Sequence, residues 1–145
     1  MLRKVFFIIL FFFLYNNIQS QIFSDSLITS FINEWVGVPY KWGGSSKKGI
    51  DCSQLNKKFY QEVYNISICN TCREQFLKAK RISFQNLSQG DLLFFHSRSS
   101  PSGWHCGIYL GDSKFIHASS RKTGVIISNI KDKDYRMRFR SGGRI

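Results

Sequence analysis

Acidic residues are scarce in this sequence of 145 residues, in which nine Asp and Glu stand against 21 Lys and Arg for a net charge of +12. Such a charge draws a domain to anionic partners, and nucleic acid is the usual one. The basic residues are scattered in short groups, however, and no helix-turn-helix, zinc-finger or single-strand-binding pattern lies beside them. We therefore expect a solvated basic surface that meets the anionic cell envelope, and no nucleic-acid partner.

Cysteine is absent before Cys52, which bears on how the N-terminus is processed. Residues 1–20 have the pattern of a secretory signal, with basic residues at the start, an apolar run over 5–15, and a polar stretch that ends at Ser20. The apolar run is shorter than the roughly 20 residues of a membrane span, and an uncleaved anchor is the alternative. We expect residues 21–145 to form a secreted or periplasmic monomer and not a lipoprotein. Loss of Arg3 and Lys4 lowers the net charge from +12 to +10.

A second Cys-x-x-Cys pair is also missing, which limits what Cys69 and Cys72 can do. One such pair is typical of a redox motif, of half a zinc site, or of a structural disulfide. No second pair completes a four-cysteine zinc site, and no βαβ pattern of a thioredoxin-like protein surrounds the motif. In an exported protein we expect a local disulfide or two buried thiols, and no metal or other cofactor.

The pattern of elements changes once along the chain. Helical spacing predicts a helix capped by Ser24 or Asp25 that ends near Trp35, a helix over 52–64 and a short one over 73–79. Short apolar runs separated by Gly, Asp and Ser then predict strands. The sequence thus predicts a single α+β domain, with N-terminal helices packed on an antiparallel sheet. The predicted strands are 91–95, 105–110, 114–118, 125–128 and a possible last one over 135–140.

Cys52, His105 and His117 form a candidate catalytic set. A cysteine at the first position of a helix has its thiolate favoured by the helix dipole, and the same free amides can hold an oxyanion. His105 and His117 flank a predicted hairpin turn at 111–113, and their parity places both on one face of the sheet. Taken singly, a buried Cys is usually inert and a strand His structural. Together they predict a thiol nucleophile, its base, and a residue that orients the base, whereas Cys106 points into the core.

Six motifs in order then resemble the NlpC-type cell-wall peptidases, which are papain-like cysteine peptidases of bacteria. The resemblance covers about residues 27–130 and implies a papain-like fold. It also implies hydrolysis of peptidoglycan stem peptides, typically at the γ-D-glutamyl–diamino acid bond. The motifs are Tyr40–Gly44, Asp51–Leu55, Arg73–Gln75, Gly90–Phe95, His105–Gly111 and Phe115–Ala118.

The resemblance assigns a role to each candidate residue. Cys52 matches the nucleophile, His105 the general base and His117 the orienting residue, while the hydroxyl of Tyr40 matches a group at the oxyanion site. Asp51 and Ser53 match residues that recognise the free amine of the stem peptide. A carboxylate suits an ammonium group, but both residues also suit the N-cap of the predicted helix 52–64, which is the competing interpretation.

Three positions depart from the family pattern. Gln54 stands where the family usually has glycine, Cys106 replaces a small aliphatic residue, and Cys72 replaces a small hydroxyl residue. None removes a catalytic group, and Gln54 bears on the width of the cleft. Two alternative functions remain open: an amidase or acyltransferase on the same scaffold, and a non-catalytic wall-binding module favoured by the basic charge.

Overall fold

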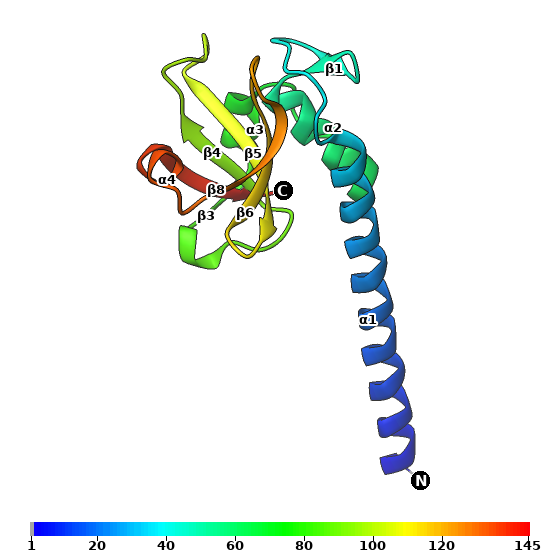
Figure 1. Cartoon of the computed structure of the whole chain (residues 1–145). Coiled ribbons are helices and arrows are strands. Elements are labelled where there is room, and N and C mark those ends of the chain that lie inside the picture. The colour runs from blue at the N-terminus through cyan, green and yellow to red at the C-terminus, as the bar shows by residue number, and fades with distance from the viewer. Residues whose placement is uncertain (1) are drawn as a thin grey trace.

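The computed structural model describes residues 2–145 and begins with one long helix, α1 (Leu2–Trp35). We expected this helix to begin near Ser24. Its end at Trp35 is confirmed, but it extends back through the predicted signal segment, because no Gly or Pro interrupts it. Figure 1 shows its N-terminal half projecting away from the domain. The stretch Val5–Trp35 is long and apolar enough to cross a membrane, a property that a signal sequence shares.

Helix α2 (Cys52–Tyr64) lies at the centre of the domain and matches its predicted bounds. Asp51 caps its first turn, and Asn65 ends it in the left-handed region with φ of 55°. Leu55 and Phe59 are fully buried, and Phe59 meets the ring of Phe31 from α1 edge to face at 5.1 Å. The contact fixes α1 against α2.

Helix α3 (Cys72–Lys78) begins one residue earlier than predicted and follows a capping box. The Thr71 hydroxyl accepts a hydrogen bond from the Glu74 amide, while the Glu74 carboxylate accepts one from the Thr71 amide. The cap places Cys72 at the first position of α3, facing the first turn of α2.

One antiparallel sheet of six strands completes the domain, in the order β3-β8-β4-β5-β6-β7. Four of its strands confirm the predicted strands to within a few residues. A separate two-stranded hairpin, β1 (Ser45–Ser46) and β2 (Gly49–Ile50), lies between α1 and α2. The sheet strands are β3 (Lys80–Ile82), β4 (Leu92–His96), β5 (Trp104–Gly111), β6 (Lys114–Ser120), β7 (Gly124–Asn129) and β8 (Phe139–Arg144).

The prediction of a last strand over 135–140 is wrong. Helix α4 (Lys133–Arg138) occupies most of that range, and β8 begins only at Phe139. The helical turn places the ring of Tyr135 5.0 Å from that of Phe115, over the outer face of the sheet. Packing by this aromatic residue therefore outweighs the strand propensity of the segment.

The sheet is covered on both faces. The helices pack on one face through Cys106, Ile108 and Ile116, which are fully buried. Leu93, Phe95, Phe115 and Ile130 form a smaller aromatic core on the other face. These observations confirm an α+β domain with N-terminal helices on an antiparallel sheet, and the alternation along β5 confirms that Cys106 points towards the helices.

Candidate active site

Cys52 lies at the mouth of a cleft between the start of α2 and the ends of β5 and β6. The cleft has a volume of about 390 Å³, and we call it the Cys52 cleft. Cys52 as a whole is only 6% exposed. The lining includes Tyr40, Trp42, Cys52, Trp104, His105 and Arg121.

Burial controls the protonation of Cys52. It raises the pKa of the thiol to about 12, while backbone amides of Cys106, Ser53 and Cys52 itself pull the pKa down. We expected the start of the helix to favour the thiolate. The amides do lie there, but the loss of water around the sulfur outweighs them, so Cys52 rests as a thiol and needs a base.

His105 and His117 are in direct contact. Nε2 of His105 lies 2.7 Å from Nδ1 of His117, which confirms that both side chains share one face of the sheet. Burial, with the charge of Arg138, lowers the pKa of His105 to about 4, and burial also lowers the pKa of His117. Both imidazoles are therefore neutral near pH 7.

This contact restricts the tautomers. If His105 is to take a proton at Nδ1, its own proton must sit on Nε2 and point at Nδ1 of His117. The proton of His117 then lies on Nε2, which is 2.9 Å from Oγ of Ser128 and 3.4 Å from Oη of Tyr135. Ser128 therefore continues the hydrogen-bonded chain as the acceptor from His117.

Sequence reasoning did not find Ser128 or Tyr135. Ser128 lies on β7, which pairs with β6 so that His117 faces Ile126. Alternation along β7 then puts Ser128 on the same side as His117. That parity was readable in the sequence, but the register of β6 with β7 was not.

The carboxylate of Asp51 is engaged by its own neighbours. Oδ1 accepts hydrogen bonds from the Gln54 amide and the Ser53 hydroxyl, both at 2.8 Å, and Oδ2 accepts one from the Gly43 amide at 3.0 Å. This is the geometry of an N-cap, as the competing interpretation had it. Asp51 and Ser53 therefore fix the start of α2, and neither lines the Cys52 cleft.

Tyr40 and Gln54 lie on different sides of α2. Tyr40 lines the Cys52 cleft, and partial burial with the nearby Cys52 raises the pKa of its phenol, so the hydroxyl keeps its proton. Gln54 donates from Nε2 to the backbone oxygen of Asn70 at 3.0 Å and lies outside the cleft lining. Its departure from glycine thus ties α2 to the segment before α3 and does not narrow the cleft.

The cysteines pair differently from the expectation. Cys72 forms a disulfide with Cys106, 34 residues away, and Cys69 is free. A local bridge between Cys69 and Cys72 is therefore wrong, because the capped start of α3 turns Cys72 towards β5. The sequence held a signal for the bridge, since Cys72 and Cys106 are two of the three departures from the family pattern.

A buried thiol at a helix start, with a histidine pair on a facing antiparallel sheet, defines the papain-like class of cysteine peptidases. The NlpC/P60 family model matches residues 37–144, and the chain belongs to the NlpC/P60 family.

Two curated relatives are each about one third identical to this chain over the aligned residues. Murein DD-endopeptidase MepS/Murein LD-carboxypeptidase of Escherichia coli K12 is 35% identical over 131 residues, covering 90% of this chain and 68% of the relative. A probable endopeptidase NlpC homolog of Haemophilus influenzae is 35% identical over 129 residues, covering 89% of this chain and 67% of the relative. The match therefore spans nearly the whole of this chain and about two thirds of each relative.

Solved structures have the same fold. An NlpC/P60 family protein from Bacillus cereus has a TM-score of 0.73 at 27% identity, over 83% of this chain and 39% of that one. The NlpC/P60 domain of the peptidoglycan hydrolase SagA has a TM-score of 0.68 at 27% identity, over 83% of this chain and 98% of that one. The second match therefore covers nearly the whole of the SagA domain.

Proposed function

We propose that this protein is an exported endopeptidase that hydrolyses peptidoglycan stem peptides with Cys52, His105 and His117. The observation that carries the proposal is the 2.7 Å contact between the two histidines beside a cleft that holds the Cys52 thiol. The names of the relatives, murein endopeptidases among them, support the substrate. The apolar N-terminal helix supports export, with cleavage after Ser20.

The proposed reaction begins when the Cys52 sulfur attacks a substrate carbonyl and its proton passes to Nδ1 of His105. Since the Cys52 pKa is about 12 and that of His105 about 4, the proton moves as the new bond forms. The oxyanion accepts hydrogen bonds from the Tyr40 hydroxyl and from amides at the start of α2. His105 then protonates the leaving amine, and water hydrolyses the thioester. The chemistry uses no metal or cofactor.

Two bonds of the stem peptide are candidates. Resemblance to the family favours the γ-D-glutamyl–diamino acid bond, with Asp51 and Ser53 holding the free amine. A D,D-peptide bond is the second candidate, because the MepS relative is named for it. The three hydrogen bonds that the Asp51 carboxylate already accepts leave it poorly placed for an ammonium group, and this favours the D,D bond.

The proposal is tested by mass spectrometry of muropeptides after incubation with residues 21–145, with a Cys52→Ala variant and with a matched Cys69→Ala variant. Cleavage by the parent and by Cys69→Ala, but not by Cys52→Ala, is expected. A product that ends in γ-glutamate identifies the first bond, and separated cross-linked stems identify the second. Cleavage that survives in Cys52→Ala contradicts the proposal.

The same experiment separates the alternative functions. Transfer of the acyl group to an added amine, without release of hydrolysed peptide, indicates an acyltransferase on this scaffold. Binding to the wall without product from any variant indicates a binding module. The intact histidine pair beside Cys52 is the reason that we favour hydrolysis over both.

A further inference from the structure

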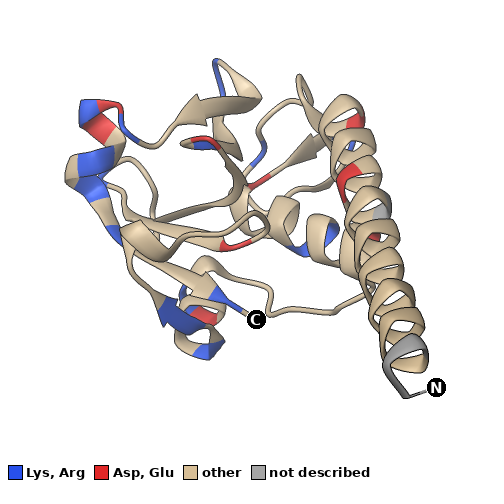
Figure 2. Cartoon of the chain, turned by 90° about the horizontal axis from the view of Figure 1, so that it is seen from below, with Lys and Arg blue, Asp and Glu red and all other residues tan. Residues whose placement is uncertain are grey.

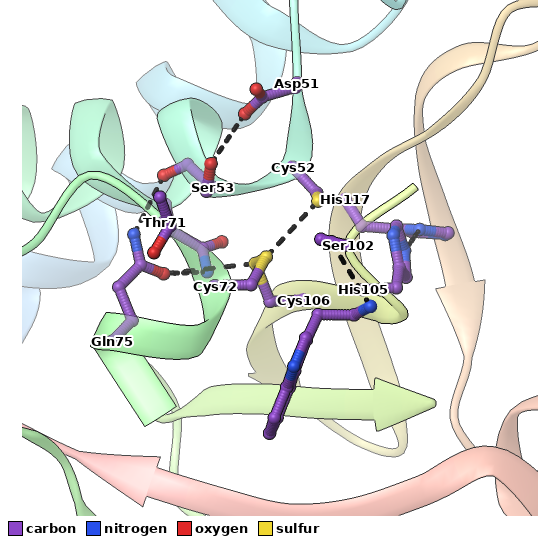
Figure 3. Close-up of a disulfide and its surroundings, with 12 residues drawn as sticks. Asp51, Cys52, Ser53, Thr71, Cys72, Gln75, Ser102, His105, Cys106 and His117 are labelled. Carbon is purple, nitrogen blue, oxygen red and sulfur yellow. Dashed lines mark hydrogen bonds between the residues drawn. A yellow bond between two sulfur atoms is a disulfide. The ribbon is translucent and has the colours of Figure 1, made fainter. Parts of the chain in front are cut away.

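The proposed nucleophile lies against a disulfide. Sγ of Cys52 is 3.4 Å from Sγ of Cys72, whose partner in the disulfide is Cys106. The three sulfur atoms all lie within 4.8 Å of one another, and all three residues are buried. Figure 3 shows the Cys52 sulfur directed at the bridge. We call Cys52, Cys72 and Cys106 the sulfur cluster.

A hydrogen-bond acceptor lies near the sulfur of Cys106 and suits its reduced, thiol form. Its sulfur lies 3.9 Å from Oε1 of Gln75, a fully buried side chain. A disulfide sulfur has no proton to donate to this oxygen, whereas a Cys106 thiol has one. Gln75 is held in place because its Nε2 donates to the backbone oxygens of Ser53 and Cys69. An acceptor for the released thiol is therefore already positioned.

We propose that the sulfur cluster is a thiol–disulfide exchange site, in which Cys72 captures Cys52 and thereby switches the peptidase off. The proposal rests on the proposed function only for the consequence, the loss of peptide cleavage. The exchange itself rests on the contact between the Cys52 thiol and the Cys72–Cys106 bridge, and it requires a side-chain movement that brings the three sulfur atoms into line.

The exchange balances without an external oxidant. The Cys52 thiolate attacks Sγ of Cys72, a Cys52–Cys72 bond forms, and the Cys72–Cys106 bond breaks with its electron pair on Cys106. The proton that left Cys52 ends on the Cys106 thiolate. The product has the same mass and one disulfide, but its thiol is at Cys106, where it cannot attack substrate.

Cys72 is the sulfur that Cys52 reaches first, because the 3.4 Å contact is with Cys72. A thiol-containing reductant, such as a small dithiol, reduces the Cys52–Cys72 bond and returns an active thiol. The cluster thus links the activity of the cleft to the thiol–disulfide balance of its compartment. The free Cys69 is outside the cluster and provides a matched control.

Replacing Cys106 with Val tests the exchange, because it leaves Cys72 without its bridge partner and facing Cys52. The full chain in mild detergent is treated with oxidised glutathione, then alkylated and digested with trypsin. We expect the peptide 49–57 linked to 59–73, with peptide cleavage reduced about tenfold and restored by a dithiol. The Cys69→Ser variant, treated in the same way, keeps the link between 59–73 and 99–114 and keeps its activity.

The unaltered chain gives a second test that does not depend on how the variant folds. Held at alkaline pH without oxidant, which raises the thiolate fraction of Cys52, it is expected to form the 49–57 to 59–73 link at the expense of the 59–73 to 99–114 link. Absence of the Cys52–Cys72 link from both experiments overturns the proposal. If the link forms but no form of the chain cleaves muropeptides, the exchange stands and the proposed function fails.

Discussion

His117 is the residue on which the proposed base depends. It accepts a hydrogen bond at Nδ1 from His105 only while its own proton is held on Nε2 by Ser128. In the proposed reaction His105 presents a free Nδ1 to Cys52, because its Nε2 contacts His117. The proposed orienting role is therefore one of tautomer selection rather than of charge, since burial keeps His117 neutral.

Replacing His117 with Ala is expected to lower kcat by a hundredfold or more, on the order seen when the orienting member of a catalytic triad is altered, with little change in KM. Asn is the matched variant, because its side-chain oxygen can accept the hydrogen bond from Nε2 of His105. Kinetics on a soluble muropeptide, with circular dichroism as a check on the fold, measure the effect. If Asn recovers no more activity than Ala, the hydrogen bond is not what matters.

The low pKa of His105 predicts the pH dependence of catalysis. Because the imidazole takes a proton only near pH 4, the acid limb of kcat/KM is expected near that value, well below the usual range for histidine. Arg138 contributes to the lowering, so Arg138→Gln is expected to move the limb upward. A limb near 6.5 that is unchanged in Arg138→Gln contradicts this assignment.

The lowered pKa of His105 also makes the stability of the folded protein depend on pH. Between pH 6.5 and about 4 the unfolded chain binds a proton at His105 while the folded chain does not. The contribution of neutral His105 to the free energy of unfolding is therefore fully present above pH 6.5. It is lost by about 1 kcal/mol per pH unit as the pH drops towards 4. Urea titrations at several pH values measure this slope, and a His105→Gln variant is expected to reduce it.

At the scale of elements, the start of α2 places the proposed nucleophile, Cys52, next to the cap of the helix. Asp51 caps the helix one residue before Cys52, so the same carboxylate that stabilises the helix also sets the position of the thiol. The proposed recognition of a substrate amine requires the charge of Asp51, whereas capping requires only an acceptor oxygen. The two roles are separable by substitution.

Replacing Asp51 with Asn is expected to keep the cap on the Gln54 amide and most of the stability and cleavage, although the hydrogen bond from the Gly43 amide is lost. Ala removes the cap and is expected to cost about 1 kcal/mol, with lower kcat as the start of α2 frays. Thermal unfolding and muropeptide kinetics on both variants measure this. A KM that rises strongly in Asn, with stability unchanged, shows instead that the charge binds substrate.

Elements with a strong local signal were predictable from sequence. Helix α2 has a cap, an apolar stripe and a left-handed stop within its own residues, and its bounds were predicted. The structure of residues 135–140 was not predictable in this way, since helix α4 depends on the packing of Tyr135 against Phe115 on the outer face of the sheet. The Cys72–Cys106 disulfide was not predicted for the same reason, because it can form only once α3 has packed on β5. The histidine pair was predictable because one hairpin joins its two strands.

At the scale of the whole molecule, part of the excess positive charge lines a groove. A groove of about 860 Å³ is lined by Arg98, Arg138 and Arg140, and we call it the arginine groove. It shares Ser97 and Trp104 with the lining of the Cys52 cleft. Figure 2 shows Lys and Arg on several parts of the domain, including the edge that lies farthest from the N-terminal helix.

The arginine groove predicts how the protein meets its substrate. Exposed charges attract an anionic polymer through water, and salt screens that attraction over about 8 Å at physiological ionic strength. Raising the salt concentration is therefore expected to raise the apparent KM for intact peptidoglycan and to leave kcat nearly unchanged. A small neutral muropeptide is expected to show little of this dependence.

Replacing Arg98 and Arg140 together with Gln is expected to raise the KM for intact peptidoglycan several-fold and to flatten its salt dependence. Arg138 is left in place because its charge acts on His105. Lys47 and Lys48, in the β1–β2 hairpin, form the matched control: the double Gln variant removes the same charge away from the groove. Rates measured on sacculi across a salt series test this. If both pairs raise KM equally, net charge alone draws the protein to the wall; if only the groove pair does, the charge beside the Cys52 cleft positions the substrate.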